Sequence, residues 1–257
     1  MAFVVIAVVA IVASGLTFFS GFGLGTLLLP AFALFVPVDQ AVAMTAVVHF
    51  LNSLFKIAIV GRHADRDTLV RFGLPAIVAA IMGAWLLGQL SRAQPLFSYE
   101  VLGRSVDVVP MKLAVGVLLS LFAMIEVLPR FRGLAFPKRF MPLGGFLSGF
   151  FGGLSGMQGA LRAAFLARAG LSAEAFVATS GVIACLVDVS RLGVYAGRLA
   201  EVRHELDWPL VAVAVAAALA GALAGKRLLA GMTMETVQRI VAVLLVLVAV
   251  GLMTGVL

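Results

Sequence analysis

Two glycine-broken apolar segments hold the residues whose types could do chemistry in this chain. The first contains Gly23 and Gly25 ahead of Pro30, and the second covers residues 152–159 ahead of Arg162. Paired broken helices in the two halves of a membrane protein are typical of a transporter's substrate site. A charge at membrane depth costs ~2.5–3.5 kcal/mol on insertion scales, so an arginine at this depth is expected to have a functional role. The chemistry predicted is the binding of an anion.

Helix N-termini are expected to form the anion cradle. If the glycine turns lie at mid-membrane, one N-terminus near Gly23 and Gly25 and another near Ser155 and Gly156 point at the bilayer centre. Each offers unpaired N–H groups and about half a positive charge. The alternative is that the glycines only permit close helix packing. The duplication of the motif favours the site.

Arg162 is the principal candidate for binding the anion. Ser155, Gln158 and Arg162 recur at helical spacing, and an arginine on a helix leans back toward its N-terminus, here toward the cradle. Its guanidinium would supply a forked donor to a sulfonate or carboxylate. The alternative is that Arg162 snorkels to the membrane interface together with Arg168.

A second polar group sits on two other apolar segments. His49 and Asn52 lie one turn apart, and Asp188 and Arg191 are three residues apart. We predict that His49 or Asp188 carries a proton that couples transport to the proton gradient, because imidazole titrates near neutral pH. His49 is preferred because no charged residue lies one turn away. Asp188 and Arg191 could instead neutralise each other.

Hydroxyl groups form a secondary set of candidates. Thr45, Thr179 and Ser180 could hydrogen-bond the substrate, as could Asn52, although hydroxyls on membrane helices often bond their own backbone. The sequence contains no metal-binding His/Glu spacing, no nucleophile elbow and no nucleotide loop. We therefore expect neither an enzyme, nor a metal site, nor a cofactor.

Composition places these residues in a multi-pass membrane protein. Of 257 residues, 63% are hydrophobic and 12% are charged, and apolar runs long enough to cross a bilayer recur along the chain. The net charge of +7 lies in short loops, which indicates membrane topology rather than nucleic-acid binding. The single cysteine, Cys185, excludes an internal disulfide.

The apolar runs predict ten helices, three of them too short to span a membrane. Non-helical backbone beside such short helices is tolerated within the membrane only where it is buried in protein or lines a water-filled cavity. The expected helices are residues 2–19, 23–35, 39–60, 68–90, 111–128, 140–151, 155–168, 172–196, 208–229 and 233–257.

The spacing of matching residues predicts that the chain is an internal duplication. Thr45 and Thr179 are separated by the same number of residues as Pro75 and Pro209, and the glycine segments align with a small shift. The expected parts are an N-terminal transmembrane repeat (1–128), a basic cytoplasmic linker (129–139) and a C-terminal transmembrane repeat (140–257).

Charge predicts the orientation. The linker region carries Arg130, Arg132, Lys138 and Arg139 without an acid, so it should face the cytoplasm. If each glycine segment is a hairpin, the repeats are inverted and both termini lie outside. If each crosses once, the repeats are parallel. The charges favour an all-α polytopic membrane protein with two inverted repeats, each a glycine-broken re-entrant hairpin plus about three transmembrane helices.

The paired motifs resemble those of a known family. Gly21-Phe22-Gly23-Leu24-Gly25 with Pro30 is echoed by Gly149-Phe150-Phe151-Gly152-Gly153, and Ala41…Thr45 is echoed by Ala175…Thr179-Ser180. Together they are similar to the sulfite exporter TauE/SafE family of membrane permeases. The resemblance implies movement of small sulfur-containing or organic anions across the bacterial inner membrane. Arg162 stands where the family pattern usually has proline, so substrate choice could differ.

The sequence therefore favours a secondary transporter for an anion such as a sulfonate or sulfite, coupled to the proton gradient. The alternative is a non-transporting membrane scaffold or assembly subunit, which has no need of duplicated broken helices or a buried arginine. The expected partners are the small anion and the lipid bilayer, with no nucleic acid. The oligomeric state stays open, with a homodimer as one alternative.

Overall fold

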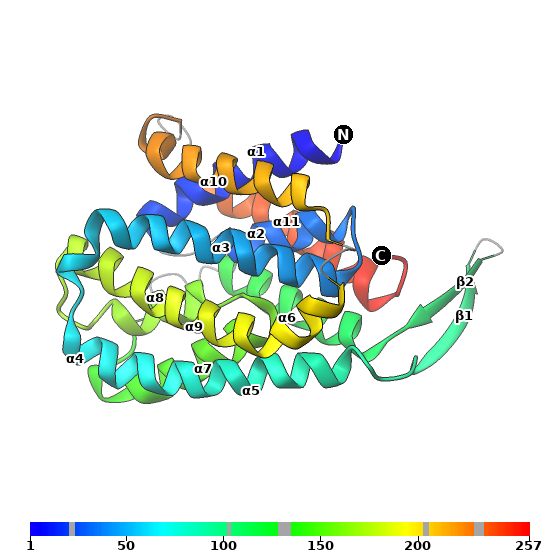
Figure 1. Ribbon diagram of the computed structural model, residues 1–257, viewed down its shortest axis with the longest axis horizontal. Helices are drawn as coiled ribbons and strands as arrows, with labels where there is room; N and C mark the ends of the chain where they lie inside the picture. The colour runs from blue at the N-terminus through cyan, green and yellow to red at the C-terminus, as the bar shows by residue number, and fades with distance from the viewer. Residues whose placement is uncertain (21–23, 102–103, 128–134, 203–205, 229–233) are drawn as a thin grey trace.

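The computed structural model describes residues 1–20, 24–101, 104–127, 135–202, 206–228 and 234–257. Most of the described residues are helical (Figure 1). The main helices are α1 (Ala2–Ser20), α2 (Leu24–Ala33), α3 (Val38–Val60), α5 (Leu74–Leu90), α6 (Pro110–Val127), α7 (Met141–Ser155), α8 (Gly159–Leu166), α9 (Ala173–Val202), α10 (Trp208–Leu228) and α11 (Met234–Met253). Short helical turns are η1 (Gly61–His63), α4 (Arg66–Thr68), η2 (Leu69–Gly73) and η4 (Lys138–Phe140).

Helix length and apolar content support an integral membrane protein. Among the described residues, three stretches are long and apolar enough to cross a bilayer: Val38–His63, Arg66–Leu90 and Ala173–Ala196. Four shorter apolar helices accompany them: Ala2–Leu16, Leu24–Ala33, Pro110–Ile125 and Trp208–Ala224. Most expected helix boundaries agree with the observed ones to within a few residues.

One element departs from the all-α expectation. Strands β1 (Phe97–Val101) and β2 (Arg104–Val108) form an antiparallel hairpin between the expected helices 68–90 and 111–128, where no strand was predicted. The hairpin projects away from the helices (Figure 1). Tyr99 on it donates a hydrogen bond to the Thr254 carbonyl, 2.5 Å away, so it stands beside the C-terminal end of the chain.

Each main helix pair joins a helix of the N-terminal half to a helix of the C-terminal half. Helix α1, the first of the N-terminal half, packs on α10, and α7, the first of the C-terminal half, packs on α5. Helices α3 and α9 occupy the same position in their halves and pack on each other, as do α6 and α11. Each half therefore completes its packing with helices of the other, and the two cannot be separate globular units.

Glycines bring α7 against α5. A Cβ atom at Gly145, Gly149 or Gly153 would collide with a backbone carbonyl oxygen of the facing helix segment. These glycines are four residues apart and lie along one face of α7, so they form a groove for the α5 backbone. For this helix, the close-packing alternative is correct. The partners are the carbonyls of Phe72, Ala76 and Ala80.

The second helix break comes later than predicted. The expected helix end at residue 151 and restart at 155 are wrong, because α7 continues to Ser155 and α8 begins at Gly159. Gly152 and Gly153 stay helical and serve packing. Gly156 makes the break with φ of 81°, a left-handed conformation that glycine adopts without a Cβ penalty.

The short turns that carry basic residues, η1, α4, η2 and η4, are the basic turns. They lie at one end of the molecule, and the two termini lie at the other. Lys138 Nζ lies 3.5 Å from Asp67 Oδ2, which joins the end of the basic linker to the turn between α3 and α5. In Figure 1 both termini lie toward the end that carries the β-hairpin, away from α4. This grouping of the described segments agrees with the one expected from charge.

Replacing Gly149 with alanine should destabilise the fold. The added methyl would meet the Ala76 backbone, which can move only with α5. Overpacking of this kind typically costs about 1–3 kcal/mol. We expect Gly149→Ala to lower the melting temperature in detergent by several degrees.

Gly88→Ala is the matched control on α5. No atom lies within 4 Å of a Cβ built at Gly88, and alanine favours a helix by about 1 kcal/mol over glycine. An equal melting temperature for the two variants would contradict the close-packing role of Gly149.

Candidate functional site

A small, partly open cavity lies between α3, α8 and α9. Its volume is about 20 Å³, room for roughly one water molecule. Valine, glycine and alanine of α9 complete a wall that is otherwise polar. The polar lining residues are His49, Asn52, Ser53, Lys56, Arg162 and Ser180.

Helix α3 supplies most of this polar wall. His49, Asn52, Ser53 and Lys56 are spaced by three, four and seven residues, so they share one face of the helix. All four are at most 6% exposed. Gly181 of α9 faces them, and a Cβ there would lie 4.0 Å from the Lys56 Cβ. The absence of a side chain at this position helps to leave the space open.

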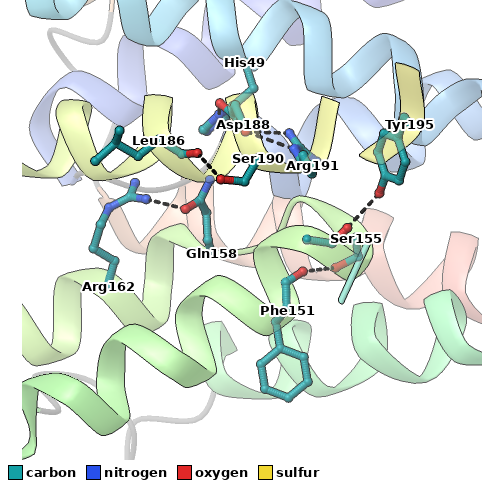
Figure 2. A network of polar contacts seen from close by, with 11 residues as sticks. His49, Phe151, Ser155, Gln158, Arg162, Leu186, Asp188, Ser190, Arg191 and Tyr195 are labelled. Carbon is teal, nitrogen blue, oxygen red and sulfur yellow. Dashed lines mark hydrogen bonds and ion pairs between the residues drawn. The ribbon is translucent and has the colours of Figure 1, made fainter. Parts of the chain in front are cut away.

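Arg162 projects into the protein rather than toward lipid. It is 3% exposed, and its Nη1 donates a 2.9 Å hydrogen bond to Gln158 Oε1 (Figure 2). Gln158 is fully buried at the N-cap position of α8, one turn before the arginine. This placement contradicts the snorkelling alternative and confirms the expected leaning of Arg162 toward the start of its helix.

An ion-pair network lies beside the cavity and joins α3 to α9. His49 Nδ1 lies 2.6 Å from Asp188 Oδ2, and Arg191 contacts Asp188 Oδ1 through Nε at 3.0 Å and Nη2 at 2.8 Å (Figure 2). All three side chains are buried. As expected, no charged residue lies one turn from His49 on its own helix, but Asp188 of α9 contacts its ring. The expected pairing of Asp188 with Arg191 is confirmed.

Positive charge dominates the described interior. Lys56, Arg162 and Arg191 are the buried cations among the side chains that the structure describes, and Asp188 is the one buried carboxylate among them. Ions in low-dielectric surroundings need compensating charge or strong hydrogen bonds. An interior with this balance favours an anionic ligand over a cationic one.

The two glycine segments meet beside this network. A Cβ at Gly25 would lie 2.5 Å from the Gly156 carbonyl oxygen and 3.9 Å from the His49 ring. A Cβ at Gly156 would lie 2.6 Å from Nη1 of Arg191. The predicted proximity of the two segments is confirmed at these two glycines. Gly23 lies outside the described residues.

Several buried donors lack a hydrogen-bond partner within the described part of the chain. They include Ser180 Oγ, Thr45 Oγ1 and Gln158 Nε2. A buried polar group without a partner costs about 1–3 kcal/mol. Ser180 lines the cavity, so its hydroxyl is placed to donate to a molecule bound there. Thr45 lies one turn before His49 and is not part of the cavity wall.

Other expected site residues have structural partners. The Ser155 hydroxyl donates to the Phe151 carbonyl at 3.0 Å, and Thr179 Oγ1 accepts the Asp65 backbone N–H at 2.9 Å. Neither lines the cavity. Asn52 does line it, while its Oδ1 accepts a hydrogen bond from the α1 residue Ser14 at 2.9 Å.

Comparison with protein families identifies the chain. The family model described as sulfite exporter TauE/SafE matches residues 6–252, which is nearly the whole sequence. The chain belongs to the TauE/SafE family. Neither the curated proteins nor the solved structures gave a match.

Family membership places this TauE/SafE chain among membrane transporters of sulfite or related anions. The family consists of transporters rather than enzymes. The cavity is compatible with this class, because its wall offers cations, an amide and hydroxyls. In the described part of the chain, no group of three or more His, Cys, Asp or Glu residues is arranged to hold a metal ion.

Lys56 and Ser53 are the cavity residues that sequence reasoning missed. Neither residue is among the site residues expected from the sequence, yet Lys56 is 6% exposed and Ser53 is 4% exposed. The missed signal is the spacing from His49 to Lys56, which repeats polar residues on one face over two helical turns. A polar stripe in an apolar helix faces protein or water rather than lipid.

Removing the Asp188 carboxylate should strongly destabilise this TauE/SafE protein. Asp188→Leu leaves Arg191 buried without its counter-charge, and breaking a buried pair from one side typically costs about 3–5 kcal/mol. The double variant Asp188→Leu/Arg191→Met should recover most of the stability, since both charges are gone. Melting temperature in detergent measures both effects.

Asp67→Leu serves as the control for the buried pair. Asp67 forms an exposed pair with Arg71 at 2.7 Å, and such pairs contribute only about 0–1 kcal/mol. If Asp188→Leu melted at the same temperature as Asp67→Leu, the buried network would not stabilise the fold.

Proposed function

We propose that this chain is a secondary transporter that moves a small sulfur-containing or organic anion, such as sulfite or a sulfonate, across the bacterial inner membrane, driven by the proton gradient. The observation that carries the proposal is the convergence of the buried side chains of Arg162 and Lys56 on one small cavity. The cavity lies between α3 and α9, which hold the same place in the two halves. Substrate sites at a repeat interface are typical of secondary transporters.

The proposal includes inverted repeats, each with a glycine-broken re-entrant hairpin. Three observations support it: the exchange of packing partners between the halves, the meeting of Gly25 with Gly156, and the shortness of α2 and α8. Ten and eight residues cover about 15 and 12 Å, half or less of a ~30 Å hydrocarbon layer. The basic turns then face the cytoplasm.

Arg162 is proposed to bind the anion through its guanidinium. Gln158 Oε1 accepts a hydrogen bond from Nη1 of Arg162. This bond holds the arginine side chain in place, and the guanidinium still lines the cavity. A planar guanidinium suits the oxygen pairs of sulfite, sulfonate and carboxylate groups. Ser180, Asn52 and Lys56 supply further donors from the two long helices.

His49 is proposed to carry the coupling proton together with Asp188. With Asp188 ionised, Nδ1 of His49 donates to it, and a proton gained at Nε2 makes an imidazolium that the carboxylate stabilises. The imidazole also lines the anion cavity. Proton binding and anion binding therefore act on the same small volume.

A non-transporting scaffold is the other class of function. A scaffold gains nothing from three buried cations, each of which costs free energy to remove from water. Its partner would also need an exposed surface, and the charged residues at issue are buried. Transport explains both facts, so we retain it.

Arg162→Ala should weaken anion binding by at least ~30-fold, because truncating one partner of a desolvated charge pair typically loses 2–5 kcal/mol. Arg162→Lys should recover only part of the affinity, since it keeps the charge and loses the fork. Calorimetry or thermal shift of the purified protein with sulfite and small sulfonates measures the effect.

Arg168→Ala is the matched control for this measurement. Arg168 follows α8 and is exposed, so its loss should leave anion affinity unchanged. Near-normal affinity in a folded Arg162→Ala protein would remove Arg162 from the site.

His49→Gln should make anion flux independent of the proton gradient. Glutamine can still hydrogen-bond Asp188 and cannot carry a proton between pH 5 and 8. Flux into proteoliposomes, measured with and without an imposed pH difference, tests the coupling. His63→Gln is the control, because His63 lies at the basic end, where its Nε2 is 3.6 Å from Glu174. Unchanged pH dependence in both His49→Gln and Asp188→Asn would exclude this pair from coupling.

A further inference from the structure

We infer that an open groove at the end of the molecule opposite the basic turns binds a membrane phospholipid whose head group carries both a phosphate and a primary amine. Lys112 contacts the phosphate, Asp39 contacts the ammonium group, and the apolar walls hold part of an acyl chain. This groove is separate from the cavity between α3, α8 and α9, so the inference goes beyond the transport function proposed above.

The groove lies where several helices reach the membrane surface. Residues 33–39, which join α2 to α3, form one side, and the end of α5 and the start of α6 form the other. Its volume is about 540 Å³, which is within the range of about 300–1,000 Å³ of small-molecule sites. The β-hairpin, which connects α5 to α6, leaves the molecule at this end (Figure 1).

The walls of the groove are suited to a hydrocarbon chain. Every lining residue except Asp39, Ser91 and Lys112 is apolar. Leu34 and Phe35 line it and are 46% and 40% exposed, so its mouth presents apolar surface to the surroundings. The spans Val38–His63 and Arg66–Leu90 have an end at the groove, which places it at the level of the lipid head groups.

One carboxylate and one ammonium group face this apolar space. Asp39 lies in the first turn of α3 and Lys112 in the first turn of α6, and both are partly buried. Within the described part of the chain, neither side chain forms an ion pair or a hydrogen bond, with the other or with a third group. Both charges are therefore available to a ligand that carries two opposite charges of its own.

The helix ends decide which charge of the ligand goes where. The N-terminus of a helix attracts negative charge and opposes a cation, so a phosphate beside Lys112 is favoured by the lysine and by the start of α6 together. Asp39 is stabilised by the start of α3 and accepts hydrogen bonds from a primary ammonium group. A purely anionic head group would be repelled by Asp39, and a small free ion would leave the apolar walls in contact with water.

Phosphatidylethanolamine and phosphatidylcholine with the same acyl chains form a matched ligand pair, since methyl groups replace the ammonium hydrogens in the second. Native mass spectrometry of the delipidated full-length protein in detergent, titrated with each lipid, measures the fraction that holds a lipid. We expect phosphatidylethanolamine to bind at least ~5-fold more tightly, because only its ammonium donates a charge-assisted hydrogen bond to Asp39. Phosphatidylglycerol, which has no amine, should also bind more weakly than phosphatidylethanolamine.

Three variants locate the lipid at the groove. Asp39→Asn should bind phosphatidylethanolamine and phosphatidylcholine within about twofold of each other, and Lys112→Gln should weaken both by at least ~5-fold, because both contain the phosphate. Ala93→Trp should also weaken both, because Ala93 is exposed and lines the groove, so the larger side chain occupies it. All three changes are at exposed or partly buried positions, so the protein should fold.

Asp67→Asn and Lys138→Gln are the controls, because they remove one charge of each sign at the basic turns. Both should bind the lipids as the unaltered protein does. Equal binding of phosphatidylethanolamine and phosphatidylcholine by the unaltered protein, or tighter binding of phosphatidylglycerol, would overturn the inference. So would unchanged lipid binding in Lys112→Gln and Ala93→Trp. A rise in melting temperature with inorganic phosphate equal to that with phosphatidylethanolamine would assign the groove to a free anion instead. None of these outcomes affects the proposed transport function.

Discussion

The contact between His49 and Asp188 fixes how the central helices of the two halves face each other. A buried carboxylate is tolerated only when it is fully engaged, and Asp188 is held by α3 on one oxygen and by its own helix on the other. The 2.6 Å contact sets the rotation of α3 about its axis. Lys56 lies two turns further along the same face, so it is directed at α9 as well.

Glycine makes this polar interior possible by letting backbones approach. In α7 it admits the α5 backbone, and at Gly25 and Gly156 it brings the two broken segments into contact. In α10, Gly221 similarly faces the Ile11 carbonyl of α1. Close backbone contact replaces the apolar driving force that helices lack in lipid. It also keeps the interior narrow, which explains why the cavity at the charged residues has so little volume.

Sequence reasoning recovered the elements better than their contacts. Apolar run lengths placed most helix boundaries, because a span needs a minimum number of apolar residues. The break at Gly156 was missed because packing glycines and a turn glycine look alike in sequence, and only positive φ at one of them distinguishes the two. The β-hairpin was missed because the elements were predicted from long apolar runs, and a short strand has none.

The sequence predicted only part of the site, because some of its residues are brought together by contacts between helices. Arg162 was identified from the cost of its charge, which requires no knowledge of neighbours. The role of Lys56 depends on the packing of α3 against α9, and the pairing of His49 depends on a residue 139 positions away. Ser155 and Thr179 were expected at the substrate, yet the hydroxyl of each forms a hydrogen bond with a backbone group. Ser155 bonds its own helix, as hydroxyls on helices often do, and Thr179 bonds a distant segment.

In the proposed mechanism, the placement of His49 and Lys56 on one helix face provides a physical basis for coupling anion binding to a proton. Seven residues separate them, which corresponds to ~10 Å along α3. At an effective dielectric constant of about 20, a unit charge at that distance changes an ion's energy by about 1.7 kcal/mol. In the proposed mechanism, a proton on His49 would strengthen the binding of an anion held beside Lys56 by more than tenfold. Coupling of this size arises from position alone, and the Asp188 contact provides that position by holding the imidazole at the cavity wall.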